Sequence, residues 1–425
     1  MDVEKLKQKI LDLAIRGKLV PQDPNDEPAS VLIEKIRAGK EALIKQGKIK
    51  RDKNESYIFK GDDNSYYEKV AQKTVKIDKD IPFDIPSNWQ WVRLSEITNT
   101  ISAGGDRPDV FSKIKTEQCQ IPIFSNGIES DGLYGYTNTA KIYDRSITVS
   151  ARGTIGFSCI RNEPYVPIVR LISVVPNVNI SLDYLYIFFS GAMESGDGTS
   201  TPQLTVPNIK QKFIALPPRE EQDRIVRIVN TATGIIKKIA VFQNDLFELC
   251  SQLKSAILAV FFGENSRYKS YYENEQKLGE ILKYEQPAKY IVNSTNYSDD
   301  FATPVLTPGK TFILGYTNEK EGIYHVNGEK VIIFDDFTTA SRLVDFNFKV
   351  KSSAMKILTI SNQELFDVEY MYLLLQTIHV NNNTHKRYWI SNFATRKVKI
   401  HTIQEQTLIV KEIKRLYSII EKVVG

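Results

Sequence analysis

Residues 208–222 read NIKQKFIALPPREEQ, and residues 392–406 read NFATRKVKIHTIQEQ, which keeps the same outline. A second pair of segments precedes them, LSEI at 94–97 and LGEI at 278–281. The differences 278 − 94 and 392 − 208 both equal 184, so the two pairs share one offset. Repetition at a fixed period indicates duplicated structural units. The sequence therefore predicts two similar domains.

The segment between the two copies predicts a long helix. Its apolar residues recur in alternating steps of three and four, which is the heptad pattern of a coiled coil. This seam consists of Ala232, Ile235, Ile239, Phe242, Leu246, Leu249, Leu253, Ala256 and Val260. Shorter seams open the chain (Val3, Leu6, Ile10, Leu13) and close it (Ile409, Ile413, Leu416, Ile420, Val423). LKQKIL at 6–11 also resembles LKSAIL at 253–258, so the two end helices together resemble the central one.

We therefore predict an α+β fold. Two similar globular mixed α/β domains would be separated by long antiparallel coiled-coil helices in a pseudo-two-fold cyclic arrangement. The expected parts are an N-terminal half-helix (1–20), a basic helical insertion (21–87), a first domain (88–216), a central helix (217–270), a second domain (271–400) and a C-terminal half-helix (401–425). Short β-type runs such as IPIFS and KVIIF, and apolar helices at 181–193 and 365–378, would fill the domains. The tetrapeptide GYTN marks the middle of both copies.

Composition limits the classes of protein to which the chain can belong. With 425 residues, of which 42% are hydrophobic, it can bury two or three separate cores. No run of 18 apolar residues occurs and the first residues are charged, so we expect a cytoplasmic protein. The scattered cysteines Cys119, Cys159 and Cys250 offer neither a disulfide framework nor a metal knuckle, and we expect them to be reduced.

The basic excess of the chain is concentrated in one segment. The formal net charge is +5, and residues 33–53 alone carry eight Lys or Arg against three acidic residues. Residues 100–215 carry ten basic and ten acidic residues. The basic segment is typical of a solvated helix, and the alternative is that its lysines hold DNA phosphates or a partner subunit. Charge alone does not single out a nucleic-acid-binding protein.

Several motifs together resemble the specificity subunits of Type I restriction–modification systems over nearly the whole chain. They are LAIRGKLVPQ (13–22), IPSNWQWVRLSEI (85–97), GYTN with RGTIG (152–156), LPPREEQDRIV (216–226), TPVLTPGKTFILGYTNE (303–319), FDDFTTA (334–340) and FKVKSSAMKIL (348–358). The resemblance implies two target recognition domains, each of which reads one half of a bipartite asymmetric DNA sequence. It also implies two methyltransferase subunits and restriction subunits as partners, which methylate adenine or cut DNA. The segment IHTIQEQ departs from the first copy because it lacks Pro-Pro.

The catalytic motifs of such partners do not occur in the sequence. An adenine methyltransferase needs a Gly-rich cofactor loop and an Asn/Asp-Pro-Pro-aromatic segment, and neither occurs here. We expect a non-catalytic chain without a cofactor, and the resemblance implies that S-adenosylmethionine, ATP and Mg belong to partner subunits. Asp335 and Asp336 are expected in a solvated turn. The histidines at 325, 379, 385 and 401 lack metal-ligand spacing and are expected at the surface.

Candidate DNA-reading residues combine groups that recognise base edges with small residues that let a loop enter a groove. In the first copy they are Arg107, Ser125, Asn126, Tyr136, Arg152 and Thr154. In the second copy they are Lys310, Tyr316, Thr338, Thr339, Arg342 and Lys351, with Lys386 and Arg387 as phosphate or stacking contacts. The structural alternatives place Tyr136 in the core and make Gly153 only a turn residue.

Two other classes of protein remain as alternatives to DNA recognition. A coiled-coil scaffold whose globular ends bind proteins would account for the heptads and the neutral domains, but not for the paired motifs. An enzyme of unrecognised type would need an acid, base or metal constellation that the sequence does not display.

Overall fold

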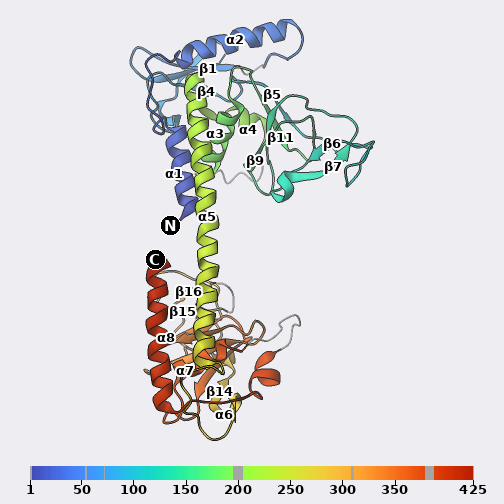
Figure 1. The fold of residues 1–425 in the computed structure, drawn as a ribbon. Coiled ribbons are helices and arrows are strands. Elements are labelled where there is room, and N and C mark those ends of the chain that lie inside the picture. The colour runs from blue at the N-terminus through green and yellow to red at the C-terminus, as the bar shows by residue number, and fades with distance from the viewer. Residues whose placement is uncertain are drawn as a thin grey trace. The chain divides into compact units, whose positions relative to one another are not determined.

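The computed structural model describes residues 2–52, 55–70, 72–194, 204–307, 311–378 and 387–424. The chain divides into two compact units, Met1–Val241 and Phe242–Gly425, called here the N-terminal unit and the C-terminal unit (Figure 1). Each unit contains one copy of the repeat. The expected α+β class is confirmed, because helices and short strands mix within each unit.

The N-terminal unit begins with two helices, and most of its strands are four to six residues long. Its elements are α1 (Val3–Ile15), α2 (Ala29–Lys45), β1 (Ser56–Lys60), β2 (Tyr66–Val70), β3 (Lys73–Lys76), η1 (Asp78–Asp80), β4 (Gln90–Arg93), β5 (Thr98–Ala103), β6 (Ile121–Phe124), η2 (Glu129–Gly132), β7 (Leu133–Thr137), β8 (Ser146–Val149), β9 (Ser158–Arg161), β10 (Val166–Pro167), β11 (Ile172–Pro176), α3 (Leu182–Glu194), α4 (Val206–Lys210) and β12 (Phe213–Leu216). The long helix α5 (Arg219–Phe262) starts here and ends in the C-terminal unit.

The elements of the C-terminal unit repeat the order of the strands β4–β12, although the short helices between the strands differ. They are β13 (Gln276–Lys277), α6 (Leu278–Ile281), β14 (Leu282–Glu285), η3 (Pro287–Tyr290), β15 (Thr303–Leu306), β16 (Ile313–Thr317), β17 (Val331–Asp335), β18 (Ser341–Val344), β19 (Lys349–Val350), β20 (Met355–Ile360), α7 (Val368–Gln376), η4 (Trp389–Phe393), β21 (Lys397–Val398) and α8 (Ile403–Val424). The apolar helices expected at 181–193 and 365–378 are α3 and α7, whose Tyr184 and Tyr370 are fully buried.

The strand that opens each copy pairs with the strand that closes it. In the first copy Val92 of β4 pairs with Ile214 of β12. In the second copy Gln276 of β13 pairs with Val398 of β21. Gln276 and Val398 lie 184 residues after Val92 and Ile214, respectively. The offset found in the sequence is therefore also the offset between equivalent strand pairs.

The larger sheets of the two copies correspond as well. The four-stranded sheets have the orders β5-β11-β8-β9 and β14-β20-β17-β18, and the three-stranded sheets have the orders β10-β6-β7 and β16-β15-β19. The antiparallel pair within each three-stranded sheet has an irregular register at the equivalent place, between Ile123 and Phe124 and between Val305 and Leu306. The predicted repeat of sequence is therefore a repeat of structure.

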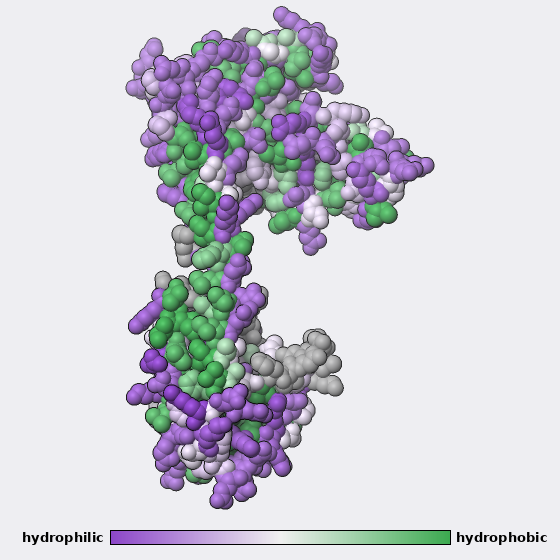
Figure 2. Space-filling view, viewed as in Figure 1, coloured by the Kyte–Doolittle hydropathy of each residue, from purple (hydrophilic) through white to green (hydrophobic). Residues whose placement is uncertain are grey.

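Much of the predicted heptad seam on α5 is exposed. The exposed fractions of Ile235, Phe242, Leu249, Leu253 and Val260 lie between 48% and 67%. The residues that α5 buries belong to other positions, such as Ile225, Val229 and Ile236 in the N-terminal unit and Leu258 and Phe261 in the C-terminal unit. Figure 2 shows apolar surface along α5 and α8 in the C-terminal unit. The long helix is thus confirmed, while its seam presents apolar surface to solvent.

The C-terminal helix α8 runs antiparallel to the end of α5. Glu405, near the start of α8, accepts a hydrogen bond from the backbone N–H of Ser270, just beyond α5 (2.8 Å). Near the other end of α8, Glu421 pairs with Lys254 of α5 (3.1 Å). The antiparallel packing expected for this helix is therefore present within the C-terminal unit.

The insertion at 21–87 packs against the first domain through its basic residues. Arg37 of α2 pairs with the buried carboxylate of Glu96 (2.5 Å). The Nζ atom of Lys40 donates to the backbone carbonyl of Ser95 (2.8 Å), and Lys210 pairs with Asp52 (2.8 Å). Arg37 and Lys40, two of the cations that suggested a solvated or DNA-holding helix, therefore hold the insertion to the domain.

Candidate nucleic-acid interface

Asn126 joins three loops of the first copy. It follows β6, its Oδ1 atom accepts a hydrogen bond from the N–H of Ala151 (2.8 Å), and its Nδ2 atom donates to the carbonyl of Val169 (2.7 Å). The residue after Ala151 is the exposed Arg152, so two of the predicted reading segments lie side by side. Because the amide is used in both directions, Asn126 supports these loops. Ser125, just before it, is half-buried and donates its backbone N–H to Gly132 (2.8 Å).

The turn after Arg152 supplies a further hydroxyl. Gly153 has a φ of +69°, in the left-handed region where residues other than glycine are strained. The Oγ1 atom of Thr154 is buried, and no hydrogen bond reaches it from the described residues. A buried hydroxyl without a partner is a site of unmet hydrogen-bonding capacity. The turn is present, with Arg152 exposed and the Thr154 hydroxyl buried.

Arg107 and Tyr136 approach one another through the segment 111–112. The guanidinium of Arg107 lies 4.6 Å from the ring centre of Phe111. Ser112 and Tyr136 exchange backbone hydrogen bonds of 2.9 and 2.8 Å. A Cβ atom on Gly135 would lie 2.5 Å from the Phe111 ring, so this GYTN glycine permits the close approach. Tyr136 is half-buried, which places it at the edge of the core.

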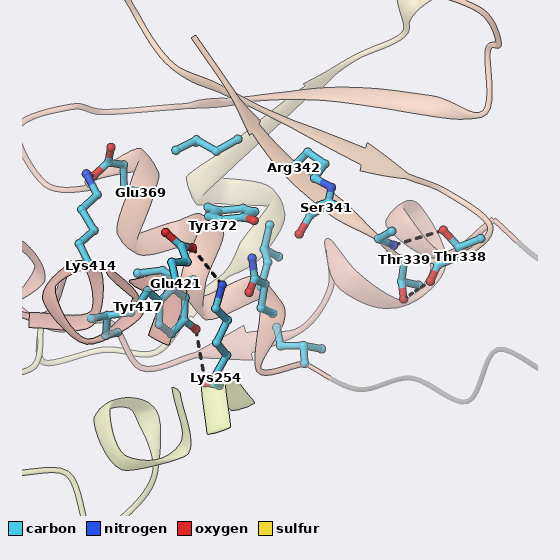
Figure 3. Close-up of a pocket in the computed structure, with 17 residues that line it drawn as sticks. Lys254, Thr338, Thr339, Ser341, Arg342, Glu369, Tyr372, Lys414, Tyr417 and Glu421 are labelled. Atoms are coloured by element: carbon cyan, nitrogen blue, oxygen red, sulfur yellow. Dashed lines mark hydrogen bonds and ion pairs between the residues drawn. The ribbon is translucent and has the colours of Figure 1, made fainter. Parts of the chain in front are cut away.

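In the second copy, Thr338, Thr339 and Arg342 surround one short turn between β17 and β18. The Thr338 hydroxyl donates to the carboxylate of Asp335. Thr339 has a φ of +61°, in the left-handed region. The exposed Arg342 lies on β18, the edge strand of its sheet. Three of the predicted residues are therefore brought together (Figure 3).

This turn borders a cavity of about 680 Å³ within the C-terminal unit. Residues of α5, α7, α8 and β18 line it, and Figure 3 shows Lys254, Arg342 and Glu421 among them. The hydroxyl of Tyr417 donates to the carbonyl of Lys254 (3.3 Å), and burial raises the pKa of Tyr417 to about 12. The cavity mixes cationic, anionic and aromatic groups.

A cluster of charges on α7 orders one wall of that cavity. Burial acts to raise the pKa of Glu369, but hydrogen bonds from Lys330 and Lys414 outweigh it and lower the pKa. Glu369 is therefore ionised at neutral pH and ties α7 to α8 and to the start of β17.

The remaining predicted residues of the second copy lie in two places. Tyr316 on β16 is half-buried and pairs with Pro304 on β15. Lys351 donates its backbone N–H to Leu306 (2.8 Å), and its Nζ atom lies 5.9 Å from the Tyr297 ring centre. Arg387 is exposed and directly precedes Tyr388, whose N–H donates to the carbonyl of Asp336 (2.9 Å) beside the Thr338 turn. Lys310 and Lys386 lie outside the described residues.

Two expectations about polar residues are wrong. Asp335 and Asp336 are 4% and 0% exposed, so these two aspartates are buried beneath the turn and not solvated. His401 is 2% exposed, and its ring nitrogens contact the Tyr370 hydroxyl (2.6 Å) and the Tyr268 carbonyl (3.2 Å). Asp336 and His401 have hydrogen-bond partners far away in sequence, which local patterns do not reveal. His325 is exposed as expected.

Arg161 orders the loop after Asn126, and it was not among the residues predicted from the sequence. Its guanidinium lies 3.5 Å from the ring centre of Phe124 and donates to Thr148 (2.9 Å) and to the carbonyl of Asp131 (2.6 Å). Burial lowers its pKa, although arginine remains charged. Its position at the end of an amphipathic strand resembled an ordinary surface cation, so no sequence signal distinguished it.

Two further features of the described ranges bear on other classes of site. No group of three or more His, Cys, Asp or Glu side chains in them is placed to hold a metal ion. None of the helices in the same ranges is long and apolar enough to cross a membrane.

The geometry defines the class of protein. It is a tandem-repeat protein in which two copies of one sheet-and-helix domain carry loop-borne basic, amide and hydroxyl groups, with a 44-residue helix between their motifs. Loops on a rigid scaffold are where functional residues concentrate.

Comparison with known proteins shows which family this chain resembles. Residues 86–241 match the family described as Type I restriction modification DNA specificity domain. The chain is 54% identical over 125 residues to the specificity subunit of the Type I restriction enzyme EcoR124I/EcoR124II of Escherichia coli, covering 29% of this chain and 31% of that protein. It is 31% identical over 188 residues to a putative type I specificity subunit of Mycoplasma pneumoniae, covering 40% of this chain and 56% of that protein.

A solved structure supports the fold. A chain determined in work on complex assembly and conformational transition of the type I R-M system aligns with 81% of this chain and 93% of its own length, at a TM-score of 0.55 and 13% identity. The chain spans 31% and 56% of the lengths of the two curated relatives. Residues 86–241 are therefore similar to the Type I restriction modification DNA specificity domain, and parts of the chain are similar to Type I specificity subunits.

Proposed function

We propose that this chain is the DNA-sequence-recognition subunit of a Type I restriction–modification complex in the cytoplasm. The observation that carries the proposal is the equivalence of the two copies down to strand register, with Val92–Ile214 repeated as Gln276–Val398. Two equivalent readers on one chain suit a bipartite asymmetric target. The domain at 88–216 reads one half-site and the domain at 271–400 reads the other.

Each reading surface combines positioning and recognition groups. In the first domain Arg107, Asn126 and Arg152 lie on neighbouring loops, and in the second domain Thr338, Arg342 and Arg387 lie around one turn. Arginine recognises guanine through two parallel hydrogen bonds, and hydroxyls contact several bases. The remaining candidates contact phosphates or support the loops. They are Ser125, Tyr136, Thr154, Lys310, Tyr316, Thr339, Lys351 and Lys386.

Catalysis in this proposal belongs to partners. Two methyltransferase subunits carry S-adenosylmethionine and methylate adenine, and restriction subunits use ATP and Mg, so this chain needs no cofactor. The exposed seam of α5 provides an apolar surface for the methyltransferase subunits, since soluble chains seldom leave such a stripe uncovered. A protein-binding scaffold would use the same seam but gives no role to the repeated loops.

A domain exchange tests the proposal. Residues 88–216 are replaced by the equivalent domain of a specificity subunit with a known target, and both complexes are assembled with methyltransferase subunits. Methylated positions are then mapped in the DNA of the expressing cells. We expect one half-site to change and the other to persist. A change in both halves, in neither, or an absence of sequence-specific methylation by the parent chain contradicts the proposal.

A further inference from the structure

A completely buried ion pair lies beneath the Thr338 turn. Lys356 of β20 and Asp336, which follows β17, approach to 3.2 Å, and their side chains are 0% and 1% exposed. No hydrogen bond from the described residues reaches the Nζ atom of Lys356 or the Oδ2 atom of Asp336. Removing two charges from water carries a free-energy cost that an ion pair often fails to recover. Fold stability alone therefore gives no reason for this pair.

Asp336 ties three segments together. Its Oδ1 atom accepts a hydrogen bond from the N–H of Trp389 (2.8 Å), and its carbonyl accepts one from the N–H of Tyr388 (2.9 Å). Its own N–H donates to the carbonyl of Ala354 (3.0 Å), just before β20. The ion pair to Lys356 adds a fourth connection, into β20 itself. The turn that carries Thr338 is thus fixed relative to the segment that carries Arg387.

The first copy builds the same place without charge. Ala151 and Ile172 correspond to Asp336 and Lys356 in the paired sheets, and they are 0% and 1% exposed. The carbonyl of Ala151 accepts a hydrogen bond from the N–H of Leu204 (3.0 Å). Leu204 precedes Tyr388 by 184 residues, so this bond is equivalent to the one from the N–H of Tyr388 to the carbonyl of Asp336. The domain fold is therefore compatible with an apolar pair at this position.

The turn itself also needs external support. Asp335 accepts hydrogen bonds from the N–H of Phe337 (3.0 Å) and from the Thr338 hydroxyl, which order the turn internally. Thr339 adopts a φ of +61°, a conformation that costs a threonine free energy and persists only when its surroundings impose it. The tethers made by Asp336 connect this turn to the rest of the domain.

We propose that Asp336 and Lys356 are positioning residues for sequence discrimination by the second domain. The pair holds the Thr338–Arg342 turn and the Arg387 segment in one register, so that their polar groups meet the base edges of one half-site together. Neither residue touches DNA, because both are fully buried. The inference rests on the proposed function and adds which elements set the specificity of the second half-site.

The test removes both charges and keeps the volumes. The double variant D336N/K356M retains an acceptor for Trp389, and full-length chains are assembled with methyltransferase subunits. Each complex selects from a library of random-sequence duplexes, and the bound DNA is sequenced. A matched control, E68Q/R93M, removes the paired carboxylate and guanidinium of Glu68 and Arg93 (2.7 Å apart, 11% and 12% exposed) in the other unit.

We expect the wild type to enrich two half-sites, and D336N/K356M to keep the first while its preference at the second falls about tenfold, or about 1.4 kcal/mol. Its melting temperature should stay within a few degrees of the wild type. The control should keep both half-sites. Retention of both preferences by D336N/K356M overturns the positioning role, and so does a parallel loss of both with a lowered melting temperature. A wild-type complex that enriches no bipartite sequence overturns the proposed function itself.

Discussion

Gln222 and Gln406 make the same two kinds of hydrogen bond in the two halves of the chain. Gln222 accepts from the N–H of Ser181 (2.9 Å) and donates to the carbonyl of Pro217 (3.0 Å). Gln406 accepts from the N–H of Asp367 (2.8 Å) and donates to the carbonyl of His401 (2.7 Å). Both glutamines are fully buried. Each one joins the segment before α3 or α7 to the first turn of α5 or α8.

Truncating either glutamine should destabilise its own unit. Q406A leaves the N–H of Asp367 and the carbonyl of His401 without a partner, and such buried groups cost about 1–3 kcal/mol. Denaturant unfolding of the full chain should show this loss. The exposed Q252A on α5 is the control and should change stability by less than about 0.5 kcal/mol. Equal losses of unfolding free energy in Q406A and Q252A would contradict a structural role for the buried amide.

The contact between Arg37 and Glu96 should hold the insertion to the first domain. Burial raises the pKa of Glu96, while Arg37 acts to lower it. R37M leaves a buried carboxylate without its cation, so we expect a loss of about 1–3 kcal/mol. The exposed K45M on the same helix should be nearly neutral. Limited proteolysis should then cut the R37M insertion faster than that of K45M, and identical cleavage rates would contradict this account.

The stability of the C-terminal unit should fall in mild acid because of His401. Burial lowers the pKa of His401 below its ordinary value of 6.5. The unfolded chain therefore binds a proton at a higher pH than the folded chain, so stability is complete above about pH 6.5 and decreases as pH falls below it. H401Q should reduce this pH dependence in thermal melts between pH 7.5 and about 5. An unchanged slope would assign the acid sensitivity to other groups.

The exposed seam of α5 should be needed for assembly but not for folding. Leu249 is 60% exposed and Phe242 is 67% exposed, so L249K and F242K should change the melting temperature little. Both should prevent co-purification with methyltransferase subunits, because a lysine in an apolar interface must be desolvated. The control L258K replaces a leucine that is 5% exposed and should instead unfold the C-terminal unit. Assembly of L249K and F242K at wild-type yield would place the partner surface elsewhere.

The sequence by itself determined the repeat and the helices. The 184-residue offset reappears in strand pairing, because duplicated hydrophobic patterns bury equivalent faces. The same pattern predicted α3 and α7 as buried helices and α5 as one continuous helix. These properties depend on residues close together in the chain, and periodicity reports them directly.

Only the tertiary structure decided where the charged and polar side chains go. Asp336 resembled a solvated turn residue, yet a lysine 20 residues away and a backbone N–H from Trp389 make its burial possible. Arg161 and His401 are buried for the same reason, because an aromatic ring, hydroxyls or carbonyls from distant segments satisfy them. Burial of a polar group depends on whether partners converge in space, and that convergence has no local signature in the sequence.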